Sequence, residues 1–376
     1  MEQIRMVDLK GQYEKIKDEV KVAINEVIDT TSFINGPAVK EFQENLEKYL
    51  DVKHVIHCGN GTDALQVAMM ALGLKPGDEV ITTSFTFIAT AEVISLLGLV
   101  PVLVDVEVDT FNINSEAIKK AITPKTKAII PVHLFGQCAN MDDIMKIAKE
   151  NNLFVIEDAC QAIGADYIFD DNSKKKAGTI GHVGCTSFFP SKNLGAYGDG
   201  GAIFTNDDDL AKQIRSIVNH GMTVRYYHDH IGVNSRLDSI QAAILNIKLK
   251  HLDEYAEARN NTADFYNAAF DNCEKLTTPA KFKKSTHVYH QYTLVTKDID
   301  RKTLQAYLNE KGIPAMIYYP VPLHMQKAYQ DKRYKQGDFP VTEKLSDRVI
   351  SLPMHTELTD EQLKFITDSV LEFVNK

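Results

Sequence analysis

The sequence predicts an α/β fold: a mostly parallel, seven-stranded sheet flanked by helices, followed by a smaller C-terminal α+β domain. Short β-rich runs alternate with helical segments from residue 54 to residue 205, which is typical of parallel strands joined by crossover helices. Several runs are continuously apolar, as strands buried on both faces tend to be. A chain of 376 residues is also too long for one compact core, so about two domains are expected.

The elements of the large domain follow in order along the chain. An amphipathic helix is expected within the first 30 residues, because one stripe of helical spacing holds Tyr13, Ile16, Val20, Ile24, Val27 and Ile28. The seven strands are predicted at residues 54–58, 79–83, 100–105, 128–133, 154–158, 185–189 and 201–205. The covering helices are expected near residues 62–73, 86–97, 141–151 and 207–219.

The smaller domain is predicted to follow a long helix that begins at Ser235, where Asp238 three residues later completes a capping-box pattern. We place the boundary along this helix, so that the large domain covers residues 1–245 and the small domain covers residues 246–376. The small domain is predicted to contain strands at 291–295 and 315–318 and helices at 301–311 and 359–374, the last opening on Thr359 and Gln362.

Charge and cysteine content limit the classes of function. A net charge of −9, from 42 basic and 51 acidic residues, argues against nucleic-acid or acidic-membrane binding. The five cysteines are scattered without a CxxC pair, so we interpret them as reduced core residues and predict no metal site. The N-terminus has no apolar signal region, and no apolar stretch reaches the ~18 residues of a membrane span. A cytoplasmic protein is therefore expected.

The run SFFPSKNLGAYGDGG, residues 187–201, holds a single lysine, Lys192. An apolar piece, Phe188 to Pro190, leads this ammonium into a glycine-rich turn. Burial there would disfavour the charged form and lower the pKa of the amine, as an imine-forming lysine requires. The alternative is a solvated or salt-bridged lysine at the mouth of a loop.

Three further groups follow predicted strands, at whose carboxyl ends ligands gather in parallel sheets. The Gly59–Thr62 turn leads into a helix, where unpaired N–H groups suit a phosphate, although a plain tight turn is the alternative. Asp158 ends an apolar strand and needs a partner, either a cationic ring nitrogen or a structural salt bridge. Phe87 could stack on a flat cofactor or pack in the core.

Together these groups fit pyridoxal 5'-phosphate (PLP), which needs a lysine, an acid for its ring nitrogen, a helix N-terminus for its phosphate and an aromatic face. Matching segments cover nearly the whole chain: Gly36–Pro37, NGTDAL (60–65), TSFTFIATA (83–91), PVLVDV (101–106), IEDACQAIGA (156–165), SFFPSKNLGAYGDGG (187–201), HIGVNSRLDSIQAAIL (230–245) and YYPVPLH (318–324). In these segments the chain resembles the DegT-type nucleotide-sugar aminotransferases, which are fold-type I PLP-dependent transferases.

The resemblance implies a role for each group around the cofactor ring. Lys192 would form the imine with PLP and then carry the proton between the cofactor and the amino-bearing carbon. Asp158 would pair with the ring nitrogen and keep it protonated. Gln161 would hydrogen-bond the ring hydroxyl, and Phe87 would stack on the ring.

The same resemblance implies how the phosphate is held. Gly61, Thr62 and Ser187 would bind it within one subunit. Asn234, in the GxNxR segment, would reach the phosphate of the neighbouring subunit, which implies a homodimer with shared active sites. A helix cap is the alternative role of Asn234, and both roles could hold.

Within the family, the likeness favours enzymes that aminate C3 of a UDP-3-keto-N-acetylglucosaminuronic acid, with L-glutamate as donor and 2-oxoglutarate as product, for lipopolysaccharide and other surface polysaccharides. Arg236, Tyr318 and Tyr319 would hold the sugar acid, because an arginine fork suits a carboxylate, and His324 would touch the nucleotide. Some relatives have His–Tyr at the aromatic pair, and Arg236 also occurs in relatives with neutral sugars. A neutral dTDP-linked keto deoxysugar is therefore the alternative substrate.

Two other functions are weighed on the same residues. Family dehydratases have a histidine in place of the lysine, so Lys192 argues against a dehydratase. A non-catalytic regulator or scaffold of this fold would lose one or more cofactor groups, whereas Lys192, Asp158, Gln161 and Ser187 are all present.

Overall fold

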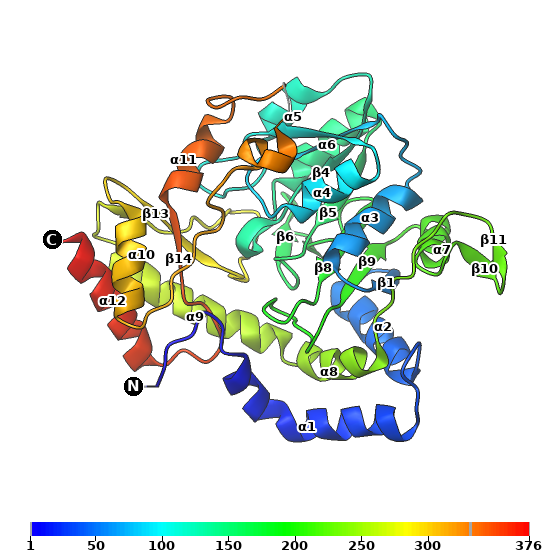
Figure 1. Cartoon of the computed structure of the whole chain (residues 1–376), viewed down its shortest axis with the longest axis horizontal. Coiled ribbons are helices and arrows are strands. Elements are labelled where there is room, and N and C mark those ends of the chain that lie inside the picture. Colours follow the sequence, from blue (N-terminus) through cyan, green and yellow to red (C-terminus); the bar gives the residue numbers. More distant parts are fainter. Residues whose placement is uncertain (1, 331–332, 376) are drawn as a thin grey trace.

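A seven-stranded sheet lies at the centre of the molecule, in the order β1-β9-β8-β5-β4-β2-β3 (Figure 1). The structure is a computed structural model that describes residues 2–330 and 333–375. Neighbours from β8 to β3 pair in parallel, and β9 runs antiparallel to both β1 and β8. The strands are β1 (His54–Cys58), β2 (Glu79–Thr83), β3 (Val100–Val104), β4 (Thr126–Ile130), β5 (Phe154–Asp158), β8 (Val183–Ser187) and β9 (Gly201–Thr205). The predicted fold class and all seven predicted strands are confirmed, with several ends shifted by a few residues.

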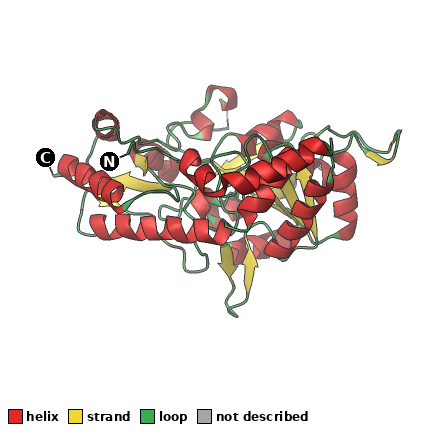
Figure 2. Cartoon of the chain, turned by 90° about the horizontal axis from the view of Figure 1, so that it is seen from below, coloured by secondary structure: helices red, strands yellow, loops and turns green. Residues whose placement is uncertain are grey.

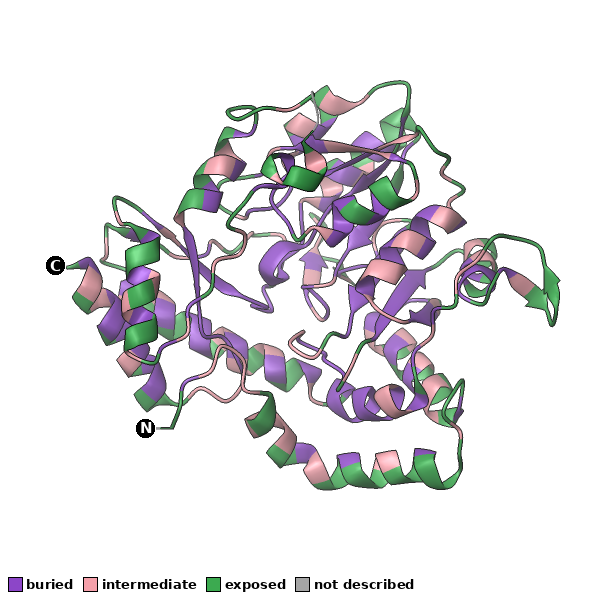
Figure 3. Ribbon diagram, viewed as in Figure 1, coloured by how far each residue is buried: buried purple, intermediate pink, exposed green. Residues whose placement is uncertain are grey.

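Helices cover both faces of this sheet, whose strands form the buried centre in Figure 3. They are α2 (Pro37–Leu50), α3 (Gly61–Ala71), α4 (Ala89–Leu96), α5 (Ser115–Ala121), α6 (Met141–Asn151) and α7 (Asp208–Ile217). Successive side chains of a strand point to opposite faces, so Val80 packs in the layer with α3, α4 and α7 while Ile81 packs in the layer with α5 and α6. This two-sided burial explains the continuously apolar strands.

The predicted N-terminal helix is α1 (Leu9–Asp29), which lies along α8 (Ser239–Leu249) at the edge of the molecule (Figure 1). Ile16 and Val20 of α1 pack against Ile244 and Ile247 of α8. Ile28, the last residue of the predicted stripe, lies at the far end of the helix and is 47% exposed. Among the residues that the structure describes, no helix combines the length and apolar character needed to cross a bilayer.

The C-terminal part builds a separate apolar core around a three-stranded antiparallel sheet. Its elements are α9 (Leu252–Phe270), β12 (Leu276–Thr277), β13 (Tyr292–Thr296), α10 (Arg301–Glu310), α11 (Pro340–Arg348), β14 (Val349–Leu352) and α12 (Asp360–Val374). The predicted strand at 315–318 is wrong: within it, Met316 forms an isolated bridge with Ser351. Ile4 from the N-terminus packs into the same core, and the boundary after residue 245 stays a prediction.

The two predicted capping boxes have different outcomes. Thr359 and Gln362 form one at the start of α12, as predicted. The box predicted at Ser235 is wrong, because α8 begins after Asp238, whose side chain makes no capping bond. The hydroxyl of Ser235 instead donates to Asp63 and accepts from the backbone of Gly59, so it ties the start of α3 to the chain before α8.

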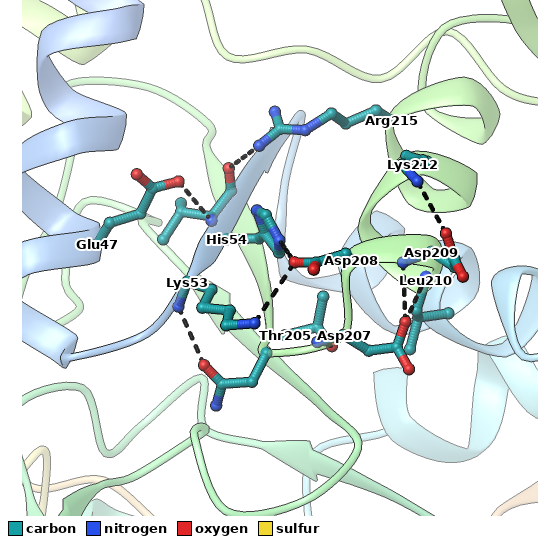
Figure 4. A network of polar contacts seen from close by, with 12 residues as sticks. Glu47, Lys53, His54, Thr205, Asp207, Asp208, Asp209, Leu210, Lys212 and Arg215 are labelled. Atoms are coloured by element: carbon teal, nitrogen blue, oxygen red, sulfur yellow. Dashed lines mark hydrogen bonds and ion pairs between the residues drawn. The ribbon is translucent and has the colours of Figure 1, made fainter.

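Two small hairpins and one surface network complete the fold. β6 (Asp166–Ile168) pairs with β7 (Lys174–Lys176), and β10 (Met222–Val224) pairs with β11 (Tyr227–His228). The β10–β11 hairpin projects from the body of the molecule (Figures 1 and 2). At the amino end of β1, His54 Nε2 lies 2.7 Å from an oxygen of Asp208, which holds α7 to the sheet (Figure 4).

A carboxylate at the end of β3 joins the C-terminal part to the sheet. Asp105 accepts three hydrogen bonds from the first turn of α11: from the Val341 and Thr342 backbone N–H groups, at 3.0 and 2.9 Å, and from the Thr342 hydroxyl at 2.8 Å. It thereby satisfies N–H groups that every helix start leaves unpaired, although it lies more than 200 residues away in sequence. This contact fixes α11 above the carboxyl end of the sheet.

Replacing Asp105 with alanine should lower the free energy of unfolding by about 1–3 kcal/mol, because the helix start loses its acceptors. Urea denaturation of the purified chain measures this. The control is Asp109→Ala, which removes an exposed carboxylate four residues later and should change stability by less than ~0.5 kcal/mol. Equal stability of the two variants would show that the contact does not stabilise the fold.

Candidate active site

Two neighbouring parallel strands bring the predicted catalytic residues to one edge of the sheet. Asp158 is the last residue of β5 and pairs in register with Cys185 of β8. β8 ends at Ser187, and Lys192 follows five residues later in a loop that returns to β9. The carboxyl ends of parallel strands share one edge, so the carboxylate and the lysine loop emerge side by side.

The carboxylate of Asp158 is buried, with 5% of the residue exposed. One oxygen accepts a 2.7 Å hydrogen bond from the hydroxyl of Thr90, in the first turn of α4, and the other accepts from the Cys160 backbone N–H at 3.2 Å. Sequence reasoning missed Thr90. Thr90 lies in the first turn of the helix that follows the strand ending at Thr83. This position could have indicated its role, because that helical turn lies on the same edge of the sheet.

The Lys192 amine lies close enough to this carboxylate to interact with it. Burial lowers the pKa of Lys192 from its ordinary value of 10.5, while attraction to Cys160 and Asp158 acts in the opposite direction. The loop is tightly folded: the Lys192 N–H donates to the Phe189 carbonyl at 2.8 Å. A Cβ on Gly195 would lie 2.2 Å from the Pro190 carbonyl oxygen, so this turn admits glycine alone.

Two side chains of helix α8 bind the loop that follows Lys192. The ammonium of Lys248, with 1% of the residue exposed, donates to the Gly195 carbonyl at 2.5 Å. Gln241 of the same helix accepts from the Tyr197 backbone N–H at 2.8 Å. Burial lowers the pKa of Lys248 to about 8. Sequence reasoning missed this buried lysine, whose signal is its place beside the apolar stripe of α8.

The start of α3 faces the end of β8 at very short range. A Cβ on Gly61 would lie 2.7 Å from the Cβ of Ser187 and 2.8 Å from the sulfur of Cys160. Glycine is therefore required for this close approach. Thr62 occupies the same first turn, whose unpaired N–H groups and positive dipole end suit an anion. The structure thus brings Gly61, Thr62 and Ser187 together.

The amide of Gln161 is held at both ends. Its oxygen accepts from the Phe135 N–H at 2.8 Å, and its nitrogen donates to the Tyr319 hydroxyl at 3.1 Å. Phe135 adopts a left-handed backbone, with φ of 57°, that points its N–H at the amide. Phe87 lies 6.3 Å from the Tyr319 ring, centroid to centroid, and is 55% exposed, so the alternative of core packing for Phe87 is wrong.

The remaining predicted residues lie in two places. Asn234 and Arg236 flank Ser235, which binds the Gly59 turn, and Asn234 is exposed. Asp238 is the N-cap of α8, so the alternative that Asn234 caps this helix is wrong. His324 is 3% exposed and its Nε2 lies 3.0 Å from the carboxylate of Glu343. Its other ring nitrogen is buried without a partner, so the structure places His324 inside the fold against Glu343.

These residues fit PLP as a group. A lysine with a lowered pKa, a carboxylate without a bound cation of its own, a glycine-lined helix start and an exposed aromatic ring lie around one edge of the sheet. Among the described residues, no cluster of histidine, cysteine, aspartate and glutamate has the arrangement of a metal site.

Comparison with known proteins supports the same assignment. Residues 14–371 match the DegT/DnrJ/EryC1/StrS aminotransferase family. The chain is 47% identical over 372 residues to a pleiotropic regulatory protein of Geobacillus stearothermophilus, with 98% of each chain covered. It is 46% identical to the UDP-2-acetamido-2-deoxy-3-oxo-D-glucuronate aminotransferase of Pseudomonas aeruginosa, over 96% of this chain and 98% of the relative. It is 42% identical to a UDP-N-acetyl-3-dehydro-alpha-D-glucosamine 3-aminotransferase of Acidithiobacillus ferrooxidans, over 96% and 95%.

Solved structures agree in fold and cofactor. DesV of Streptomyces venezuelae, in complex with a ketimine intermediate, superposes over all of both chains with a TM-score of 0.95 and 36% identity. NtdA of Bacillus subtilis, with bound cofactor PMP, superposes with a TM-score of 0.88 and 34% identity over 96% of this chain and 82% of NtdA. The chain therefore belongs to the DegT/DnrJ/EryC1/StrS aminotransferase family and is a PLP-dependent aminotransferase.

Proposed function

We propose that this chain transfers an amino group from L-glutamate to C3 of a UDP-linked 3-keto-N-acetylglucosaminuronic acid, for surface polysaccharide synthesis. The observation that carries the proposal is the 46% identity, over nearly the whole of both chains, to an aminotransferase named for that keto sugar acid. The relative named for the glucosamine sugar, at 42% identity, acts on a sugar without the carboxylate. The names of both relatives therefore support amination at C3 and a UDP-linked sugar, and the name of one supports a sugar acid.

The site supports the amino-transfer chemistry residue by residue. PLP supplies, when bound, an aldehyde for the enzyme amine and a ring that takes up electrons. Lys192 binds the cofactor and afterwards takes and returns the proton at the amino-bearing carbon, for which its lowered pKa suits it. Asp158 keeps the ring nitrogen protonated, and Thr90 holds that carboxylate in place. Gly61, Thr62 and Ser187 hold the phosphate at the start of α3.

The substrate end of the site is assigned to Arg236 and to the aromatic pair. The Arg236 guanidinium offers a planar fork of donors that matches a carboxylate, which favours the sugar acid over a neutral sugar. Tyr318 and Tyr319 follow the family's aromatic pair, and Tyr319 lies against Gln161. His324 is not assigned to the substrate, because it is buried against Glu343.

We also propose that the chain works as a homodimer in the cytoplasm. Asn234 is exposed beside the Gly59 turn, where a second copy can approach it. Five free thiols agree with a reducing compartment.

Substrate choice is tested by the reverse reaction. Purified holoenzyme is mixed with 2-oxoglutarate and a UDP-3-amino sugar acid, its neutral UDP counterpart or a neutral dTDP-3-amino deoxysugar, and glutamate formation is followed. We expect the acid to give a kcat/KM at least tenfold above both neutral sugars, a difference of about 1.4 kcal/mol. Arg236→Lys should reduce this preference, because the lysine lacks the fork. Turnover of neutral dTDP sugars alone would contradict the proposed substrate.

The pKa of Lys192 predicts how the apoenzyme takes up PLP. The neutral amine is the nucleophile, so the rate of holoenzyme formation should rise with pH and level off below pH 10.5, because burial lowers the pKa. Stopped-flow absorbance of the visible band measures this rate, and Lys192→Ala gives the baseline without the covalent link. A plateau at or above pH 10.5 would show that the amine is not desolvated.

The role of Thr90 is tested by comparing apoenzyme and holoenzyme. Thr90→Val keeps the shape but removes the donor to Asp158, so the free energy of unfolding of the apoenzyme should fall by about 1–3 kcal/mol. The loss should be smaller in the holoenzyme, because the ring nitrogen gives the carboxylate another donor. Thr90→Ser, which keeps the hydroxyl, is the control. An equal loss in both forms would argue against pairing of Asp158 with the ring nitrogen.

A further inference from the structure

The amide of Gln161 has a fixed orientation that leaves one donor unused. The Phe135 backbone N–H can only donate, so the group that faces it is the amide oxygen, 2.8 Å away. The amide nitrogen therefore faces Tyr319, 3.1 Å away, and the tyrosine oxygen accepts one of its two protons. The second proton on Nε2 remains for a further acceptor.

Tyr319 is itself firmly placed. Its ring meets the buried ring of Phe85 edge-on, with centroids 6.1 Å apart. The segment that follows is tied to the end of β2, because the Leu323 N–H donates to the Ser84 carbonyl at 3.0 Å. Burial raises the pKa of Tyr319, so its hydroxyl keeps its proton at neutral pH. The hydroxyl is therefore a permanent, neutral acceptor for Gln161.

We propose that Tyr319 is a positioning residue for Gln161. Its hydroxyl accepts a hydrogen bond from one N–H of the amide and thereby directs the other N–H at the ring oxygen of PLP. This inference rests on the proposed function and on the role that the family resemblance implies for Gln161, a hydrogen bond to that oxygen. It gives Tyr319, which lies in the segment 318–324 and is assigned above to the substrate, a second task on the cofactor side.

The proposal has a consequence that an ordinary packing role lacks. A hydrogen bond to the ring oxygen favours the deprotonated, charged form of that oxygen. It therefore lowers the midpoint of the pH titration of the bound cofactor. Without the tyrosine hydroxyl, the amide of Gln161 can turn about its remaining bond to Phe135, and its hydrogen bond to the ring oxygen weakens. The midpoint should then rise.

The test is a pH titration of the visible absorption band of the full-length holoenzyme. We expect Tyr319→Phe to raise the midpoint by roughly half a pH unit or more. Tyr318→Phe, the matched control, should leave the midpoint unchanged, because Tyr319, and not Tyr318, accepts the hydrogen bond from Gln161. In a Gln161→Ala background, Tyr319→Phe should add no further shift, since the tyrosine acts through the amide.

Two results would overturn the proposal. One is an unchanged midpoint in Tyr319→Phe together with a raised KM for the keto sugar, which would limit Tyr319 to substrate binding. The other is a full additional shift in the Gln161→Ala background, which would mean that the hydroxyl acts on the cofactor by another path. Failure of the proposed function is distinguishable, because the reverse reaction with the UDP-3-amino sugar acid would then form no glutamate, whereas the pH titration of the visible band needs no sugar.

Discussion

A carboxylate buried at the end of β5 is the constraint on which the site depends. Burying a charge costs free energy unless partners replace water, and Thr90 and the Cys160 N–H supply neutral partners for Asp158. Lys192 supplies positive charge nearby, although burial disfavours that charge. Asp158 and Lys192 thus attract each other, and a covalent bond at the Lys192 amine would change this interaction. In the proposed function, a cationic ring nitrogen of the cofactor would then become the positive partner of Asp158.

The rest of the fold serves to keep this edge of the sheet rigid. Lys248 and Gln241 hold the lysine loop from α8, and Ser235 holds the Gly59 turn against the start of α3. The C-terminal part reaches the same edge through Asp105, which accepts the first N–H groups of α11. These contacts join segments that lie far apart in sequence.

The sequence could predict what local pattern determines. Short β-rich runs that alternate with helical segments located all seven strands, and their order placed Asp158 and Lys192 at one edge. Local pattern failed where tertiary contacts compete: Ser235 has the form of a helix cap but binds Asp63 and Gly59 instead. The apolar residues at 315–318 lie beside β14 with a single bridge at Met316, so their β-propensity did not produce a strand.

Some site residues could likewise be identified from the sequence, and others only from their contacts in the structure. Lys192, Asp158 and Gly61 each had a structural alternative when taken alone, and they became informative because all three follow predicted strands and together fit one cofactor. The sequence analysis did not identify Thr90 or Lys248. A threonine in a helix and a lysine near an apolar stripe become informative only when their hydrogen-bond partners are known.

The central claim, that Lys192 carries the cofactor, is tested most directly by borohydride reduction of wild-type holoenzyme followed by peptide mass spectrometry. We expect that the visible band bleaches and that one peptide, the one containing Lys192, gains the mass of reduced pyridoxyl phosphate. A modification on another lysine, such as the buried Lys248, or fully active protein in which Lys192 is unmodified, would contradict it.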